Sequence, residues 1–392
     1  MKSVKYIYHL MLSTMRELFP IALLYAWIQV IAHLFLSQNA FFALTMGWRL
    51  GTDFGWFRDQ LHLFSNLLLL TLYSLFVTGM VQKLWKRSKD LLEVTGLSFV
   101  ATWTLIGSSS MALDRPLVAQ PAWLLYALFV FFLVAIIKGS DRYLRRWPIL
   151  PWIIGIGLVS LAYQLANGLS DYSISGLFLR METLFSTIIG DGPVHYFSVL
   201  TWSLLGPLLL FLGLPIPKIL TYPSTDFESL SLNIEAILSK KDIPYPFTLY
   251  TIQAPFALVG GVGVMMGLYL AIYSYHKFKG KNISKAFKWS FLPLLLNQPL
   301  PFLLTVPVFF QPLILVPMIL STLVLECLTI LLIHFQWLRP TVYQVPDGTP
   351  SVLFGYLASN GDIRYLIYMI AMLLLSVAIY WPFVARMKGV GK

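Results

Sequence analysis

The 392-residue sequence has few charged side chains, and it contains a single cysteine. Charged residues make up 11% of the chain, whereas a soluble domain carries about 25%. Hydrophobic residues make up 58%, and the mean hydropathy is +0.74. This composition excludes a disordered chain and an ordinary soluble enzyme, and the lone Cys327 excludes a disulfide framework. The sequence therefore predicts a polytopic membrane protein.

The sequence also lacks the motifs of self-contained chemistry. It has no P-loop, no zinc-ligand spacing and no nucleophile elbow, and its six histidines are too scattered to share a metal ion. We therefore expect no metal and no cofactor. The sequence leaves open whether the chain takes part in an enzymatic reaction.

Glu326 interrupts one of the longest apolar runs. A carboxylate is costly in hydrocarbon, so an acidic residue at that depth suggests a function by default. The alternative is a structural glutamate that is protonated or locally paired. The residues alone favour neither interpretation.

Apolar runs long enough to form membrane-spanning helices recur along the chain. A helix needs about 20 apolar residues to cross the hydrocarbon of a bilayer. The candidate spans are residues 20–36, 61–80, 123–137, 149–165, 196–214, 252–275, 313–334 and 366–384, with 94–111 as a weaker candidate. We expect an all-α polytopic fold with about ten transmembrane helices.

Two apolar regions contain residues that interrupt helices. Four prolines fall within residues 291–310, and each removes a backbone donor that a helix needs. Non-helical backbone at membrane depth must be covered by protein or line a water-filled cavity. We therefore predict a re-entrant hairpin at 291–310 and a broken element at Gly206-Pro207. Residues before position 20 and residues 172–188 have one apolar face each, which predicts interfacial amphipathic helices.

Basic residues predict the orientation of the chain. Lysines and arginines cluster after the runs at 61–80 and 123–137 and at both ends of the sequence. Because cytoplasmic loops carry the excess of basic residues, we expect both termini in the cytoplasm. The net charge of +11 therefore reflects membrane topology, and no nucleic-acid partner is expected. A lysine cluster at 277–288 does not fit simple alternation of spans, which leaves the topology of residues 191–345 open.

Glycines mark the middle of the run at 252–275, which we expect to form one long helix. Gly260, Gly261 and Gly263 would let a neighbouring helix or a ligand approach the backbone closely. An ordered series of motifs follows towards the C-terminus. Its members are Asn297-Gln298-Pro299, Val345-Pro346-Asp347-Gly348-Thr349-Pro350, Gly355-Tyr356-Leu357-Ala358, Gly361-Asp362-Ile363-Arg364 and Tyr380-Trp381-Pro382-Phe383.

This series resembles the enzyme IIC of the lactose/cellobiose family of the bacterial phosphoenolpyruvate-dependent sugar phosphotransferase system (PTS). That family has an Asn-Glu-Pro hairpin tip, a Val-Pro-x-x-Thr-Pro loop, a Gly-x-Leu-Ala loop and a Gly-Asp-x-Arg turn before its final helix. The match is closest from Val345 to Phe383. The N-terminal half agrees in its pattern of spans and its leading amphipathic helix.

The resemblance implies a homodimeric, multi-pass permease of the bacterial inner membrane. It would translocate a di- or oligosaccharide of the β-glucoside or galactoside type, which a cytoplasmic partner, enzyme IIB, would phosphorylate. Residues 1–170 would form an N-terminal bundle of the dimerisation type, 171–190 an interfacial linker helix, and 191–392 a C-terminal transport domain with hairpins.

The resemblance also assigns a candidate site. Asn297 matches the sugar-contacting asparagine of the family, while Gln298 stands at its glutamate and Leu205 at a histidine. The candidate sugar-binding residues are Asn297, Gln298, Gly261, Gly263, Thr349 and Asp362. A glutamine offers no charge to a sugar hydroxyl, which would weaken sugar binding by about 1–3 kcal/mol.

The two departures favour an alternative, in which the chain is a degenerate enzyme IIC-like protein. It would lack group translocation and act as a facilitator, a sensor or a subunit of a membrane complex. A membrane enzyme acting on lipid-linked sugars is disfavoured, because its acidic candidates are scattered.

Overall fold

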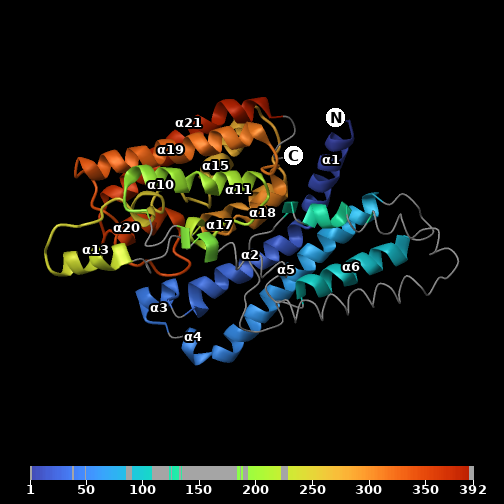
Figure 1. Cartoon of the computed structure of the whole chain (residues 1–392), viewed down its shortest axis with the longest axis horizontal. Helices are drawn as coiled ribbons and strands as arrows, with labels where there is room; N and C mark the ends of the chain where they lie inside the picture. Colours follow the sequence, from blue (N-terminus) through green and yellow to red (C-terminus); the bar gives the residue numbers. More distant parts are fainter. Residues whose placement is uncertain are drawn as a thin grey trace. The chain divides into compact units, whose positions relative to one another are not determined.

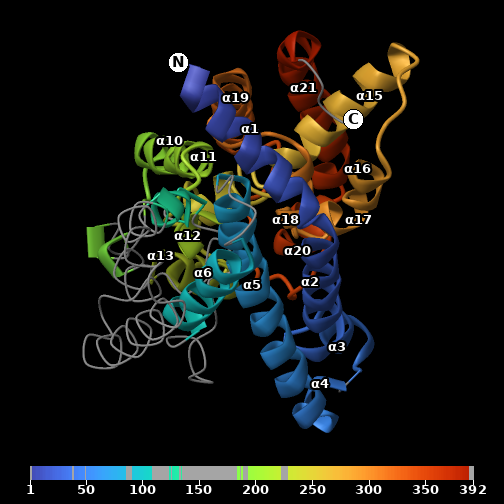
Figure 2. The ribbon, with the colours of Figure 1, turned by 90° about the vertical axis from the view of Figure 1, so that its right-hand side faces the viewer.

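A computed structural model describes most of the chain (Figures 1 and 2). The described residues are 2–37, 39–48, 50–84, 91–107, 123–124, 126–131, 134, 183–185, 187–188, 193–221 and 228–387. Their regular structure is helical apart from one isolated bridge between Ala40 and Asp347, so the predicted all-α class is confirmed. They fall into two compact units.

The first unit lies within Met1–Tyr25, Asp59–Thr183 and Gly213–Pro215. Its described elements are α1 (Lys2–Glu17), the start of α2 (Phe19–Ile31), most of α5 (Gly55–Leu84) and α6 (Leu91–Gly107). The helix α1 covers the segment predicted to be amphipathic. Helices α1 and α5 approach closely where Gly79 faces Thr14, because a Cβ at Gly79 would lie 2.9 Å from the Thr14 methyl carbon.

An aromatic cluster fills the core of this unit. The ring centroids of Tyr73 and Tyr126 lie 4.9 Å apart, and those of Phe76 and Trp123 lie 4.6 Å apart. All four side chains are buried. Pairs of buried aromatic rings at these distances contribute about 0.5–1.5 kcal/mol beyond the area they bury.

The second unit lies within Ala26–Arg58, Leu184–Leu212 and Ile216–Lys392. Its centre consists of α15 (Met265–Phe278), α19 (Pro312–His334) and α21 (Arg364–Arg386), which lie side by side in Figures 1 and 2. Helices α15 and α21 meet at Gly267, where a Cβ would lie 2.0 Å from the Ser376 hydroxyl oxygen. A small residue at this position is what allows the two backbones to approach.

Shorter elements surround this centre. They are η1 (Ala32–Leu36), α3 (Phe41–Met46), α4 (Leu50–Asp53), α10 (Tyr196–Ser203), α11 (Leu205–Phe211), α12 (Lys218–Thr221), α13 (Glu228–Leu238), α14 (Leu249–Ile252), α16 (Lys285–Trp289), α17 (Phe291–Leu295), α18 (Leu300–Thr305), η3 (Ser351–Leu353) and α20 (Phe354–Ala358). Backbone hydrogen bonds between Phe41 and Asp347 (2.9 Å) and between Asp347 and Asn39 (2.7 Å) tie residues 39–41 to the loop before η3.

Four helical segments in the described part of the chain are long and apolar enough to cross a membrane. They are Phe19–Leu36, Gly55–Leu84, Pro312–His334 and Arg364–Arg386, which confirms the predictions at 20–36, 61–80, 313–334 and 366–384. The run at 149–165 lies outside the described residues, as do most of 172–188 and part of 123–137. The total of about ten passes therefore stays a prediction.

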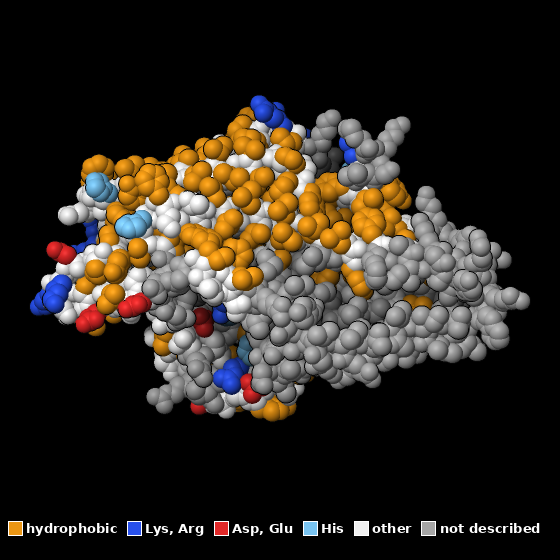
Figure 3. Space-filling model, viewed as in Figure 1, with side chains coloured by type: hydrophobic (Ala, Val, Ile, Leu, Met, Phe, Trp, Pro, Cys, Tyr) orange, Lys and Arg blue, Asp and Glu red, His pale blue; other side chains and the backbone are white. Residues whose placement is uncertain are grey.

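Hydrophobic side chains cover the surface over α10, α19 and α21 (Figure 3). On α21, Ile367, Ile370 and Leu374 are each about two-thirds exposed. Exposed apolar surface of this extent in a water-soluble chain would favour aggregation. It is the surface expected of helices that face lipid.

The structure corrects one predicted helix and shifts a predicted break. Residues 252–275 do not form one long helix, because α14 ends at Ile252 and α15 begins at Met265. The intervening turns contain Gly260, Gly261 and Gly263 with φ of +75°, +109° and +80°, backbone angles that glycine adopts without a steric cost. In the predicted broken element at 196–214, α10 and α11 are separated only at Leu204, whose backbone angles stay helical (φ −65°, ψ −24°). The separation lies just before the predicted Gly206-Pro207.

Residues 291–310 form a hairpin of short helices, as predicted, and the short helix α16 precedes it. The prolines divide the segment into α17 and α18, and the chain turns between these two helices at Leu296 and Asn297. The turn is closed by the backbone N–H of Gln298, which donates to the carbonyl of Pro293 at 2.8 Å. This hairpin presents Asn297 and Gln298 at its tip.

Candidate functional site

Asn297 occupies the turn of the α17–α18 hairpin. Its φ is +59°, a left-handed conformation that asparagine tolerates better than most residues. Its side-chain oxygen Oδ1 lies 2.6 Å from the hydroxyl of Ser351. The tip of the hairpin is therefore anchored to the segment that follows the Val345–Pro350 motif.

Ser351 connects three parts of the chain. Its hydroxyl lies 3.1 Å from the carbonyl oxygen of Leu295 and accepts a hydrogen bond from the backbone N–H of Gly260 at 3.2 Å. The side chain is only 3% exposed. We call Gly260, Leu295, Asn297 and Ser351 the Ser351 cluster. It joins the glycine turn (residues 260–263), the hairpin tip and the start of η3 at one buried hydroxyl.

Gly261 and Thr349 adjoin the Ser351 cluster. A Cβ at Gly261 would lie 3.3 Å from Pro299 Cγ, so this glycine packs against the hairpin beside its tip. Thr349 is buried two residues before Ser351, and its hydroxyl donates to the carbonyl of Pro346 at 2.7 Å. The structure thus places Gly261 against Pro299, two residues after Asn297, and Thr349 two residues before Ser351.

Gln298 and Leu205 lie beside the same region. The Gln298 side chain is half-buried next to Asn297, and it makes no hydrogen bond to the described residues. At the start of α11, a Cβ on Gly206 would lie 2.8 Å from Val262 Cγ1. This close approach places Leu205, the residue at the family's histidine position, at the edge of the glycine turn.

Gly263 faces the helical centre of its unit. Its carbonyl accepts a hydrogen bond from the Tyr380 hydroxyl on α21. A Cβ at Gly263 would lie 2.9 Å from the Met318 methyl carbon on α19. These contacts allow α19 and α21 to pack against the glycine turn, which is a structural reason for glycine at this position.

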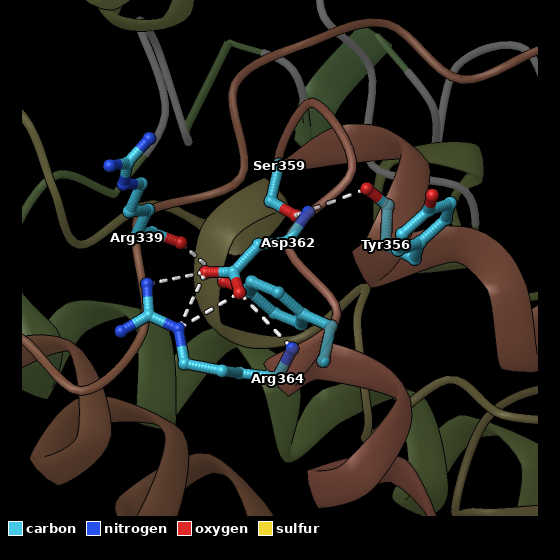
Figure 4. Close-up of polar contacts among 6 residues, drawn as sticks. Arg339, Tyr356, Ser359, Asp362 and Arg364 are labelled. Carbon is cyan, nitrogen blue, oxygen red and sulfur yellow. Dashed lines mark hydrogen bonds and ion pairs between the residues drawn. The ribbon is translucent and has the colours of Figure 1, made fainter.

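Asp362 forms a separate polar group at the start of α21 (Figure 4). Its Oδ1 accepts from the backbone N–H and the Nε of Arg364 at 3.1 and 2.8 Å, and its Oδ2 accepts from Nη2 at 2.6 Å. These hydrogen bonds from the Arg364 side chain hold the pKa of Asp362 below its usual value. Among the described residues, no hydrogen bond connects Asp362 to the Ser351 cluster.

The sequence did not single out Ser351. It directly follows the Thr349-Pro350 pair, but a serine after such a loop has no distinctive spacing. Its importance comes from the fold, which brings Gly260 and Asn297 within reach of one hydroxyl. The motif that it follows was the only available signal.

The chain is similar in sequence to components of one class of membrane transporter. No family model matches the sequence. The chain is 31% identical to the PTS system galactose-specific EIIC component of Lactococcus lactis subsp. cremoris (strain MG1363) over 156 residues, which cover 38% of this chain and 33% of that protein. These findings confirm the sequence resemblance to enzyme IIC components.

Two relatives from Bacillus subtilis (strain 168) give similar matches. The putative permease IIC component YwbA is 27% identical over 158 residues, covering 40% of this chain and 35% of that protein. The PTS system oligo-beta-mannoside-specific EIIC component is 26% identical over 161 residues, covering 40% and 35%. The matched segment thus spans between 33% and 35% of the length of these relatives.

A solved structure also aligns with the chain. It is the crystal structure of the transporter ChbC, the IIC component from the N,N'-diacetylchitobiose-specific phosphotransferase system. The alignment has 16% sequence identity and a TM-score of 0.43, and it covers 96% of this chain and 93% of ChbC.

Proposed function

We propose that this chain is the membrane permease component of a sugar phosphotransferase system. It would translocate a di- or oligosaccharide of the β-glucoside or galactoside type, and enzyme IIB would phosphorylate the sugar from the cytoplasm. The observation that carries the proposal is the sequence similarity to EIIC components, whose names specify galactose and oligo-beta-mannoside. The apolar helices of the chain are consistent with a location in the bacterial inner membrane.

The Ser351 cluster and its neighbours would form the sugar site. Ser351 holds Asn297 through Oδ1, which leaves the Nδ2 amide group as a donor for a sugar oxygen. Gln298 would add a second amide from the same turn. Gly261 has no side chain to cover its peptide groups, so a sugar could approach the backbone there. Thr349 and Gly263 would shape the surroundings of the site, and Asp362 would act from the start of α21.

The organisation of the permease follows from the same proposal. Residues 1–170 would provide a dimerisation bundle, 171–190 an interfacial linker, and 191–392 the transport domain of a homodimer. Both termini would lie in the cytoplasm, where the clusters of lysine and arginine are retained. These lysines and arginines would then face both the anionic lipids of that leaflet and enzyme IIB.

Gln298 favours a second candidate, a degenerate enzyme IIC-like protein without group translocation. A glutamine cannot take a proton from a reacting hydroxyl, whereas a glutamate can. Such a protein would bind or pass sugar without phosphate transfer, as a facilitator, a sensor or a subunit of a membrane complex.

Sugar uptake distinguishes the two candidates. The wild-type chain, Asn297→Ala and Gln298→Glu would be expressed in cells that lack related permeases, and uptake of labelled β-glucosides and galactosides would be measured with and without phosphoenolpyruvate. The proposal predicts dependence on phosphoenolpyruvate, loss in Asn297→Ala, and a gain in Gln298→Glu. Uptake without phosphoenolpyruvate supports the second candidate. No uptake by the wild type or by Gln298→Glu refutes both the permease and the facilitator.

A further inference from the structure

Glu326 is a completely buried acidic residue in the described part of α19, and the proposed sugar site does not use it. Its side chain is 0% exposed in the middle of a helix long and apolar enough to span a membrane. One carboxyl oxygen, Oε2, lies 2.6 Å from the hydroxyl of Ser203, the last residue of α10. The contact joins two helices that are 123 residues apart in the sequence.

Ser203 makes a second contact, which bears on whether Ser203 or Glu326 donates the proton between them. The Ser203 hydroxyl also lies 3.0 Å from the backbone carbonyl of Leu200. A carbonyl can only accept, and a serine hydroxyl has one proton to donate. If Ser203 donates to Leu200, the 2.6 Å contact needs its proton from Glu326. A proton on Oε2 of Glu326, donated to Ser203, lets Ser203 give its own proton wholly to Leu200, so that each contact has a full hydrogen bond.

The other carboxyl oxygen supports the same conclusion. Oε1 of Glu326 is buried, and it has no hydrogen-bond partner among the described residues. One turn earlier on α19, the Thr322 hydroxyl is also buried without a partner. An ionised carboxylate with one unpaired oxygen would be very costly here, whereas a neutral acid leaves only a carbonyl-type acceptor unpaired.

Among the described helices packed around α19, the only positively charged side chains are Arg364 and Arg386, at the two ends of α21. The ionisable side chains on α10, α14 and α21 are Tyr196, Tyr250, Arg364, Tyr365, Tyr368, Tyr380 and Arg386, and α11 has none. On α19 itself they are Cys327, which is adjacent, and His334. Among the described residues, Ser203 alone forms a hydrogen bond with Glu326.

We propose that Glu326 and Ser203 form a buried proton-binding site that holds α10 against α19. The ligand is a proton, carried on Oε2 of Glu326 and donated to Ser203. Loss of this proton would leave an unpaired anion between the helices, so their packing would depend on the proton being bound. This site is independent of the sugar chemistry proposed above, because its occupancy is defined by the two side chains alone.

Infrared spectroscopy of the purified full-length chain in detergent tests the protonation directly. At pH about 7 an exposed glutamate, with a pKa of about 4.3, is ionised. The proposal predicts that the carbonyl band of a protonated carboxylic acid is present in the wild type and lost in Glu326→Gln. The matched control Glu235→Gln, which changes an exposed glutamate on α13, keeps the band. A wild-type spectrum that does not differ from that of Glu326→Gln in this band overturns the proposal.

The pH dependence of unfolding provides a second measurement. The glutamine variant imitates the protonated acid, whereas the wild type must release a proton on unfolding above pH about 4.3. The unfolding equilibrium constant of the wild type should therefore rise about tenfold more per pH unit than that of Glu326→Gln between pH about 5 and about 7. Equal slopes would overturn the proposal.

The Ser203→Ala variant tests the partner. Without an acceptor for the acid proton, the carbonyl band should move to higher wavenumber while remaining present at neutral pH. An unchanged band position would show that Ser203 does not receive the proton, and it would also overturn the proposal.

Discussion

The Ser351→Ala variant tests the cluster that anchors the hairpin tip. The substitution removes the hydroxyl that accepts from the N–H of Gly260 at 3.2 Å and contacts Oδ1 of Asn297 at 2.6 Å and the carbonyl of Leu295 at 3.1 Å. Ser351 is buried, so water does not readily replace the lost group. A buried donor left without its partner costs about 1–3 kcal/mol. We therefore expect the free energy of unfolding to fall by about 1–3 kcal/mol.

The assay is denaturant unfolding of the purified chain in mild detergent, followed by tryptophan fluorescence. The control is Ser231→Ala on α13, whose hydroxyl is exposed and donates to the carbonyl of Glu228; its effect should stay below about 0.5 kcal/mol. A double-mutant cycle of Ser351→Ala with Asn297→Ala should give a coupling of at least about 0.5 kcal/mol. A Ser351→Ala effect no larger than the control, or a coupling near zero, would refute the anchoring role.

Three further substitutions have defined outcomes in the same unfolding assay. Gly348→Ala should cost about 1–3 kcal/mol, because φ is +74° and the new Cβ would lie 2.9 Å from a backbone carbon; no loss would contradict the turn. Asp362→Asn should cost about 0.5–1 kcal/mol at neutral pH, since the side chain of Arg364 is 42% exposed and solvent screens the pair. Because the pKa of Asp362 is lowered, this contribution is present above the ordinary aspartate pKa of about 3.9 and is lost as the pH falls through the folded-state value; an undiminished difference in acid would contradict it. Glu17→Gln, which breaks the exposed 2.8 Å pair with Lys83, should change stability by less than about 1 kcal/mol, and a larger loss would show that the pair is not screened.

The long apolar helices could be predicted because their signal is local. A continuous apolar run of about 20 residues has few alternatives to a membrane-spanning helix, and α19 and α21 begin and end close to the predicted positions. The hairpin could also be predicted, since prolines remove helical hydrogen bonds wherever they occur. The motif Gly361–Arg364 indicated a turn, and α21 begins at Arg364.

The glycine turn and the Ser351 cluster could not be predicted in the same way. Residues 252–275 are apolar throughout, and an apolar run gives the same signal whether it is helical or coiled. Here a Cβ added at Gly260, Gly261 or Gly263 would meet Leu294, Pro299 or Met318 respectively, which are distant in sequence. The role of Ser351 likewise arises from long-range contacts.

The role of Asp362 was difficult to predict for another reason, namely that its local motif fits more than one role. The motif predicted a sugar ligand because the family resemblance assigned Asp362 to the site. In the structure both carboxylate oxygens accept from Arg364, two residues away. A local Asp-x-Arg spacing is sufficient to form such a turn, so a capping role was equally compatible with the sequence. Whether Asp362 also contacts sugar remains a prediction.

Delivery of sugar for phosphorylation is the activity that we propose for the chain. Membrane vesicles containing the chain would be mixed with enzyme IIB, the remaining soluble components of the phosphotransferase system, labelled phosphoenolpyruvate, and a β-glucoside or galactoside. The proposal predicts labelled sugar phosphate that requires both the chain and enzyme IIB and is reduced by Asn297→Ala. No labelled sugar phosphate from either the wild type or Gln298→Glu would contradict it.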